Sequence, residues 1–211
     1  MNMCTKRLDA IIRSIFFLLL LQIFLFTNSY CQSVQEKRQF EIKVAGIKIG
    51  DLEAQQVKEN LNTNYSLKSN VSFWFFGKLF VDFLINAKYG EDRLLNSIAD
   101  LKSNRGEFLS TIIWKKNFYE VDANTYKFEN TDPVKQSIDL SVSKLYFKKP
   151  KHNQLLISET YGLVSLVKEV EPNVFEIEID GNRNQFHYKG DELDKVIIQN
   201  PIKNYVIQRV Y

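Results

Sequence analysis

The chain has 211 residues, with 28 Lys and Arg residues against 25 Asp and Glu residues and a formal net charge of +3. So small an excess of positive charge gives no electrostatic basis for binding a phosphate backbone, and we expect no nucleic-acid partner. The composition includes 16 Phe and 10 Tyr residues but only 8 Gly and 4 Pro residues. Because aromatic residues favour the half-buried surfaces of sheets, this composition predicts a strand-rich domain without a flexible linker.

The N-terminus has the pattern of a secretory signal peptide, which we place at residues 1–31. Three basic residues, Lys6, Arg7 and Arg13, precede an apolar run at residues 15–26. A run of this length is typical of an export signal, whereas a membrane-spanning helix needs about 20 apolar residues. The pattern predicts an exported protein, periplasmic or secreted, whose mature chain has no transmembrane span.

Cleavage is expected between Cys31 and Gln32, because Ser29 and Cys31 supply the small side chains that a signal peptidase selects. The alternative is that Cys31 carries a lipid anchor. A lipidation motif would have an aliphatic residue three places before the cysteine and a small residue just before it, but this chain has Asn28 and Tyr30 there. The sequence therefore favours cleavage over lipoprotein anchoring.

Removal of residues 1–31 would take away both cysteines, Cys4 and Cys31. The mature chain would then have no disulfide and no thiolate for metal binding or nucleophilic catalysis. We expect residues 32–37 to form a flexible leader. Residues 38–211 are expected to form a single antiparallel β domain, since a chain of this length can bury one hydrophobic core.

Apolar residues alternate with polar ones along most of the expected domain, which is the pattern of β-strands. Phe40, Ile42 and Val44 form the first alternating run, and Gly46 turns the chain into a second run at residues 47–52. Further short runs are expected at residues 65–69, 94–102, 108–114, 118–121 and 126–128. Turn-forming residues at 103–106 and 115–117 separate some of these runs.

The C-terminal region contains the strongest hairpin signal. Residues 175–179 alternate between apolar and acidic residues, and Asp180-Gly181 leads into the next run at residues 183–188. An Asp-Gly pair between alternating runs is typical of a tight β-hairpin turn. Gly190 and its neighbours predict another turn before the strands at residues 196–198 and 205–210.

One short helix is expected between Pro133 and Phe147, where Ile138, Val142 and Leu145 recur at spacings of four and three. The consecutive hairpins around it predict a mainly β fold. We expect an antiparallel meander that forms an open or partly closed barrel with this one short helix.

Residues 73–85 form the most apolar stretch of the expected domain. If they form one strand, one face carries six apolar residues: Phe73, Phe75, Leu79, Val81, Phe83 and Ile85. The opposite face carries Trp74, Phe76, Phe80 and Leu84. A strand that is apolar on both faces needs a cover on each side. The simplest interpretation is that the expected helix covers it as core, and the alternative is a hydrophobic cavity or partner surface lined by the six residues.

Three segments carry a resemblance to a known family: residues 46–52, residues 145–150, and residues 158–162, which are expected to open a strand. In these segments the chain resembles secreted Bacteroidota proteins with a domain of unknown function related to the periplasmic lipoprotein-carrier (LolA/LolB-like) half-barrel fold. The resemblance implies an open half-barrel wrapped around a helix, and it implies no catalytic residues. Relatives that carry lipoproteins bind acyl chains in an apolar concavity, which matches the aromatic stretch.

No motif in the sequence indicates catalysis, a metal or a cofactor. His152 is expected in a solvated loop and His187 on a strand surface, and no zinc-binding, nucleophile-elbow or phosphate-binding motif occurs. A carboxylate pair leaves no such signature, so a carboxylate-dependent hydrolase is kept as a minor alternative. Glu176 and Glu178 share a strand face and are expected to point into solvent.

We therefore expect a noncatalytic, exported envelope protein, without a cofactor, that binds a lipid-like or other hydrophobic ligand in an apolar concavity. The alternative is a structural or protein-interaction module of the cell envelope. A cavity of about 300 Å³ or more lined by residues 73–85 would favour ligand binding. A filled core with an exposed apolar patch would favour contact with another envelope protein.

Overall fold

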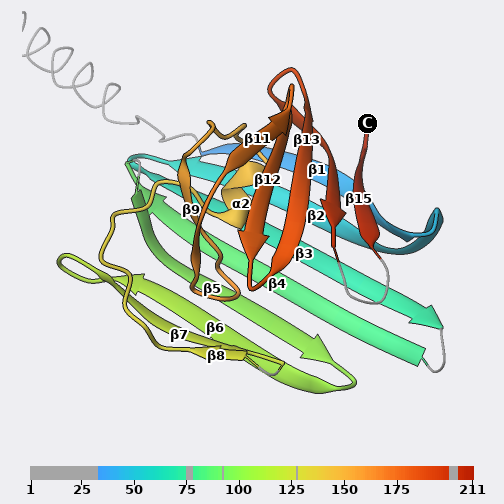
Figure 1. Ribbon diagram of the computed structural model, residues 1–211, viewed down its shortest axis with the longest axis horizontal. Coiled ribbons are helices and arrows are strands. Elements are labelled where there is room, and N and C mark those ends of the chain that lie inside the picture. The colour runs from blue at the N-terminus through green and yellow to red at the C-terminus, as the bar shows by residue number, and fades with distance from the viewer. Residues whose placement is uncertain (1–32, 75–77, 92, 127, 200–203) are drawn as a thin grey trace, which may run out of the picture. The chain divides into compact units, whose positions relative to one another are not determined.

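The structure, a computed structural model, describes residues 33–211 except residues 75–77, 92, 127 and 200–203. The expected signal peptide at residues 1–31 lies outside the described residues, as does Phe75 of the aromatic stretch. Residues 33–211 form one compact unit built almost entirely from antiparallel strands (Figure 1).

Thirteen strands form one large sheet. The first eight are β1 (Val34–Val44), β2 (Ile47–Glu59), β3 (Asn62–Trp74), β4 (Lys78–Gly90), β5 (Arg93–Ser103), β6 (Gly106–Trp114), β7 (Tyr119–Thr125) and β8 (Phe128–Asn130). The other five are β11 (Lys168–Glu171), β12 (Val174–Ile179), β13 (Asn182–Lys189), β14 (Glu192–Ile198) and β15 (Tyr205–Val210). Their order is β11-β12-β13-β14-β15-β1-β2-β3-β4-β5-β6-β7-β8, so the expected meander of consecutive hairpins is confirmed.

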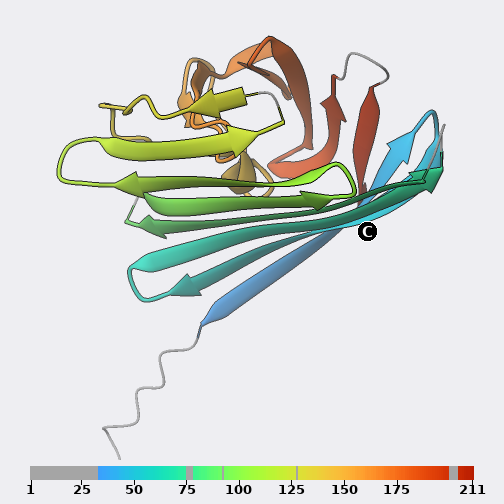
Figure 2. The same cartoon turned by 90° about the horizontal axis from the view of Figure 1, so that it is seen from below.

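The sheet is open, and its two edges are the short strands β8 and β11. In its middle, β1 pairs with β15 from Gln39–Val210 to Val44–Tyr205. The long strands curve, and the C-terminal strands lie on the same side of β1–β5 as β7 and β8 do (Figure 2). The expected mainly β, open barrel-like fold is therefore confirmed.

The chain between the two edge strands, residues 131–167, fills the inner side of the curved sheet. It contains the helix α2 (Val142–Leu145) and a separate two-stranded sheet of β9 (Leu155–Ile157) and β10 (Val164–Leu166). We call this segment the plug. Leu140, Leu145 and Leu156 of the plug are fully buried in one cluster with strand residues such as Ile85. The inner face of the sheet thus forms its core against the plug rather than against a second sheet.

The expected helix at residues 133–147 is wrong in length, because only four of these residues are helical. The backbone N–H of Ile138 donates to the Tyr119 hydroxyl at 3.1 Å, and its carbonyl accepts from the N–H of Leu94 at 3.0 Å. These contacts with the sheet replace the bonds that a helix would make at Ile138. Tertiary packing has overridden the local helical spacing.

Two other boundaries differ from the sequence-based expectations. Strand β1 begins at Val34 and pairs with β2 as far as Val34–Lys58, so most of the expected leader at residues 32–37 belongs to the sheet. The segment 158–162 does not open a strand but connects β9 to β10. Its Gly162 has a φ of +64°, and an added Cβ would lie 2.2 Å from Cγ1 of Val121. This turn therefore packs too closely on β7 for any residue but glycine.

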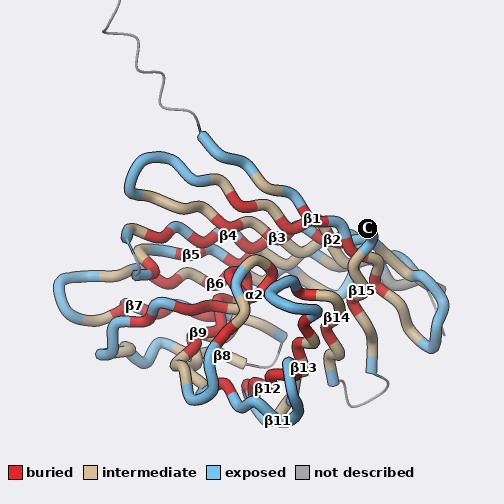
Figure 3. Tube along the Cα trace, turned by 90° about the horizontal axis from the view of Figure 1, so that it is seen from above, coloured by how far each residue is buried: buried red, intermediate tan, exposed pale blue. Residues whose placement is uncertain are grey.

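Burial alternates along the strands, and the buried positions gather around the plug (Figure 3). One cluster centres on Phe40, Leu52 and Phe186, and a second on Tyr89, Ile112 and Tyr119. The turns follow the sequence: Asp180 and Gly181 form the two-residue link between β12 and β13 with φ values of +49° and +74°. Positive φ at both positions is the geometry for which Asp-Gly is favoured.

Candidate functional site

The aromatic stretch at residues 73–85 is not one strand, and that expectation is wrong. Strand β3 ends at Trp74 and β4 begins at Lys78, with these two residues paired across an antiparallel hairpin. The register then places Phe73 opposite Leu79, and Val71 opposite Val81. Directly paired residues point to the same side of a sheet, so the odd-numbered residues of β3 up to Val71 and of β4 from Val81 share one face.

That shared face is the inner face of the sheet. Ile85 is 2% exposed and belongs to the core cluster that includes Leu145 of the plug. Phe83 is half-buried and packs against the same cluster, and Val81 is half-buried as well. Burial thus decreases from Ile85 toward the end of the sheet where Phe73 and Leu79 are paired. The core interpretation holds for Ile85 and only in part for Phe83 and Val81.

A row of apolar residues continues across the neighbouring strands at this end. Phe83 of β4 pairs with Leu101 of β5, which pairs with Phe108 of β6. We call these three residues the inner row. All three are half-buried, whereas Ile85 and Ala99, two residues further along the same face, are almost fully buried. The inner row therefore marks the position along the strands where the apolar inner face is no longer fully buried.

The outer face of the same strands also carries apolar side chains. Phe80 is 42% exposed, and its position on β4 alternates with those of Val81 and Leu79. Ile98 of β5 pairs with Thr111, which places it diagonally between Leu109 and Ile113 of β6. We call Ile98, Leu109 and Ile113 the outer patch, since each of them is an exposed apolar residue on the outer face.

The plug holds a buried carboxylate that sequence patterns gave no reason to select. Glu159 is fully buried, and its two oxygens accept the backbone N–H groups of Val142 and Ser143, each at 3.0 Å. These are the first N–H groups of α2, which have no partner within the helix. Glu159 thus fixes the start of a helix that is too short to be stable alone.

Buried tyrosines bond to both ends of this helix. The Tyr89 hydroxyl donates to Oγ of Ser141 at 2.7 Å, and the Tyr188 hydroxyl donates to the carbonyl of Leu145 at 2.7 Å. Burial, together with the nearby Glu159 carboxylate, raises the pKa of Tyr89 well above its ordinary value. Burial likewise raises the pKa of Tyr205 to about 12. Tyr89 and Tyr188 thus act as hydrogen-bond donors to the plug.

Two cavities of about 360 Å³ each occur among the described residues. The first lies between β10 and β12 and is lined by Leu155, Val164, Ser165, Leu166, Lys168, Glu176 and Glu178. The second is lined by Glu36, Gln56, Lys58, Thr63, Tyr65, Tyr89, Glu91, Lys144, Phe147 and Lys148. Among the described side chains of the aromatic stretch, residues 80–85, none lines either cavity.

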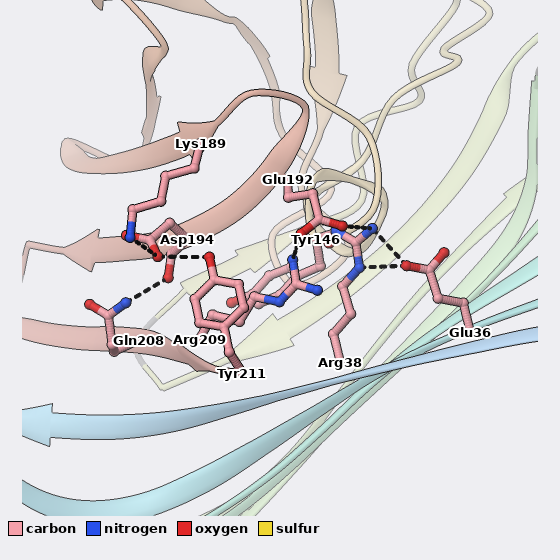
Figure 4. Close-up of polar contacts among 9 residues, drawn as sticks. All are labelled: Glu36, Arg38, Tyr146, Lys189, Glu192, Asp194, Gln208, Arg209 and Tyr211. Atoms are coloured by element: carbon pink, nitrogen blue, oxygen red, sulfur yellow. Dashed lines mark hydrogen bonds and ion pairs between the residues drawn. The ribbon is translucent and has the colours of Figure 1, made fainter.

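Arg38 connects the first strand, the plug and the C-terminal strands (Figure 4). Its side chain is buried, and a guanidinium nitrogen donates to the carbonyl of Tyr146 at 2.9 Å. Another nitrogen lies 2.6 Å from the Glu36 carboxylate and 3.9 Å from Glu192. Glu192 is also paired with Arg209 of β15 at 2.8 Å. The pairing of β1 with β15 is thus reinforced by charges that come from three strands.

Asp194 of β14 forms a second polar group beside these residues (Figure 4). It accepts from Nζ of Lys189 at 3.0 Å and from the hydroxyl of Tyr211 at 2.9 Å. Burial raises the pKa of the Asp194 carboxyl, but the hydrogen bonds from Lys189 and Tyr211 and the lysine charge outweigh it, so that the pKa lies below its ordinary value. The group ties β13, β14 and the C-terminal residue together.

A family model described as "Domain of unknown function (DUF6134)" matches residues 40–210, which is nearly the whole of the described domain. The chain belongs to this DUF6134 family. A search of the curated proteins gives no match. Among solved structures, the chain is similar to a crystal structure of a beta-barrel-like protein of domain of unknown function DUF1849 from Brucella abortus. The two share 11% sequence identity with a TM-score of 0.48, over 84% of this chain and 96% of that chain.

In this DUF6134 domain the histidines and candidate acids are placed apart. Nδ1 of His152 accepts the backbone N–H of Glu169, while His187 is half-buried on β13 with a shielded Nε2 that has no hydrogen-bond partner among the described residues. Glu176 and Glu178 lie on the face of β12 opposite the buried Phe175 and Ile177, and both line the first cavity. The described part of the chain contains no cluster of three or more metal-ligating side chains. None of its helices is long and apolar enough to cross a membrane.

Proposed function

We propose that this protein is exported to the cell envelope and holds a hydrophobic, acyl-chain-like ligand against the inner face of its open sheet, without catalysing a reaction. The observation that carries the proposal is the inner row of Phe83, Leu101 and Phe108, whose apolar side chains are not fully buried. Covering apolar surface is favourable by about 25 cal/mol per Å². A flexible hydrocarbon chain lying across the row would gain this free energy.

The surroundings of the inner row support an elongated ligand. By register, Val81 of β4 and its partner Val71 of β3 continue the same face toward the end of the hairpin. In this proposal the ligand lies in a trough on one side of three strands rather than in an enclosed pocket. A relation to the periplasmic lipoprotein-carrier half-barrel fold would fit this arrangement, since the proteins of that fold that carry lipoproteins hold acyl chains in an apolar concavity.

Export is the part of the proposal that rests on residues 1–31 of the sequence. We expect the mature chain to begin at Gln32 and to carry no lipid. Intact mass measurement of the protein recovered from the cell envelope tests this directly. A chain that retains Cys31 together with added acyl mass would instead place the protein on a membrane surface.

Ligand binding can be tested with the uncharged fluorescent probe N-phenylnaphthylamine and the mature protein. Leu101→Asn replaces one residue of the inner row, and we expect the probe to bind about tenfold more weakly, because losing one apolar contact costs on the order of 1.5 kcal/mol. Leu109→Asn is the matched control, since Leu109 lies on the same β5–β6 hairpin but on the outer face and is 53% exposed.

The two variants distinguish probe binding at the inner row from nonspecific binding of the probe to apolar surface. Equal weakening by Leu101→Asn and Leu109→Asn, or no saturable binding to the unaltered protein, would remove the ligand proposal. If the probe binds at the inner row, mass spectrometry of the lipids that co-purify with the exported protein identifies the natural ligand.

The outer patch favours a second candidate, a protein-interaction module. Ile98, Leu109 and Ile113 are between 41% and 53% exposed and lie side by side on the outer face. Exposed apolar patches of this kind often contact partners. Under this alternative Ile98→Arg abolishes cross-linking to another envelope protein and leaves the probe titration unchanged, whereas Leu101→Asn has no effect on cross-linking.

A further inference from the structure

The second cavity lies at the opposite end of the sheet from the Phe73–Leu79 pair. Lys58 and Thr63 flank the point where β2 turns into β3, and Glu91 follows the last residue of β4. The plug closes the cavity from the inside with Lys144, Phe147 and Lys148. We call it the lysine-lined cavity. Its volume of about 360 Å³ is room for roughly a dozen water molecules at about 30 Å³ each.

Positive charge exceeds negative charge in this cavity. Three lysines line it, Lys58, Lys144 and Lys148, and neither Lys58 nor Lys148 has an ion-pair partner among the described residues. Of the two carboxylates in the lining, that of Glu36 is already bound by Arg38 at 2.6 Å. The other carboxylate is that of Glu91, so the exposed Lys58 and Lys148 exceed it by one charge, in a protein whose overall charge is close to neutral.

Lys144 is the least expected of these lysines, because lysine is rarely buried. It is 5% exposed, and its ammonium donates to the carbonyl of Asp139 at 2.7 Å and lies 4.2 Å from the centre of the Tyr89 ring. A backbone carbonyl and an aromatic face hold the ammonium in place. The fold therefore fixes one cation at the base of the cavity.

Uncharged polar groups complete the lining. The Gln56 side chain is 8% exposed, and its amide nitrogen donates to the Tyr65 hydroxyl at 3.1 Å. Thr63 adds a hydroxyl at the rim, and the rings of Tyr65 and Phe147 lie 5.7 Å apart. Such walls offer both hydrogen bonds and flat apolar surface to a small ring.

We propose that the lysine-lined cavity binds a small organic anion, a sugar-sized molecule that carries a carboxylate or phosphate group. The oxyanion lies among Lys58, Lys144 and Lys148, and the hydroxyls and amide of the lining meet the remainder of the molecule. This site is separate from the proposed apolar trough, because the two share no residue and lie at opposite ends of β3 and β4.

The test is isothermal titration calorimetry of the mature protein with inorganic phosphate, glucuronate and glucose at low ionic strength. We expect saturable one-to-one binding of phosphate or glucuronate and at least tenfold weaker binding of glucose. The double variant Lys58→Gln with Lys148→Gln should weaken anion binding at least tenfold. Both lysines are exposed at the rim, so the variant keeps the buried Lys144 and the fold.

The control is the double variant Lys68→Gln with Lys88→Gln, which removes the same charge from exposed positions on β3 and β4 outside the cavity. Equal weakening in the control, equal binding of glucose, or no saturable binding of either anion would overturn the proposal. Binding of N-phenylnaphthylamine should be unchanged in both double variants, which keeps a failure of this site distinct from a failure of the trough.

Discussion

At the residue scale, glycine is required at two turns for different reasons. Gly181 has a φ of +74° but open space around an added Cβ, so only its backbone conformation excludes other residues. Gly162 has a positive φ and also lies against Val121. The first requirement is readable from an Asp-Gly pair in the sequence. The second depends on a contact with β7, which is more than 35 residues away along the chain and leaves no local signal.

Gly181→Val should destabilise the domain by more than about 1 kcal/mol, because a β-branched residue is strained at positive φ. Gly181→Asn places a residue that tolerates this conformation at the same site and should cost less. Thermal and chemical denaturation of the two variants checks the comparison. Identical stabilities for both would show that the turn does not constrain residue 181.

His187 should make the stability of the domain depend on pH. Burial, and then the nearby Lys195, lower the pKa of His187 below its ordinary value. A lowered pKa in the folded state means that protonation favours unfolding. The stabilising contribution is therefore complete above about pH 6.5 and is lost as the pH falls through the folded-state pKa.

The expected result is a fall in the thermal midpoint between about pH 7.5 and 5.5 that is smaller in His187→Phe than in the unaltered protein. Most carboxylates titrate below this range, so they contribute little to the difference. A pH profile that is the same in both proteins would show that His187 does not titrate between the folded and unfolded states.

At the scale of elements, the hairpins were predictable and the plug was not. Asp180-Gly181 and Gly190 set turns through their own backbone preferences, and alternation placed Phe175, Ile177 and Phe186 correctly inside. The hairpin of β3 and β4 was missed because residues 73–85 are almost uniformly apolar, and Gly77 is their only glycine. Apolar alternation alone cannot tell one long strand from the arms of a hairpin.

The plug was mispredicted because its structure depends on distant partners. Ile138 is bonded to Tyr119 and Leu94, and α2 begins where Glu159 accepts its N–H groups. The buried charged residues were not predicted, for the same reason. Arg38 and Lys144 read as ordinary surface charges in the sequence, and only the fold buries them.

Substitutions along β4 should show where the core ends. Ile85→Ala removes a side chain that is 2% exposed and should cost about 2–5 kcal/mol. Phe83→Ala should cost less than the 3–5 kcal/mol or so of a fully buried phenylalanine, because Phe83 is only half covered. Chemical denaturation measures both. A Phe83→Ala loss in the full range would place Phe83 in the closed core and weaken the trough.

At the scale of the whole molecule, Arg38 holds the first strand to the plug and to the C-terminal strands. Arg38→Met keeps the apolar stem but leaves the Tyr146 carbonyl and Glu36 without their partner, and we expect a loss of about 1–3 kcal/mol. Lys37→Met is the control on the adjacent residue. Its ion pair with Glu53 is exposed and 3.5 Å long, and should contribute at most about 1 kcal/mol.

Denaturant unfolding of the two variants shows whether Arg38 connects parts of the structure or acts as an ordinary surface charge. Equal, small losses for Arg38→Met and Lys37→Met would contradict the connecting role of Arg38. Limited proteolysis adds a second measurement, because weaker attachment of β1 to β15 should expose the N-terminal strand to cleavage before the rest of the domain.

The pairing of β1 with β15 also constrains when the domain can fold. Strands that are about 170 residues apart in sequence must meet before the middle of the sheet is complete, and contacts of such long range make folding slow. Until β15 arrives, one edge of β1 is unpaired along Gln39–Val44 and open to other extended chains. In a chain that emerges N-terminus first from a translocation channel, β1 would therefore lack its β15 partner until the end of the chain has emerged. During this interval the chain would most need a chaperone.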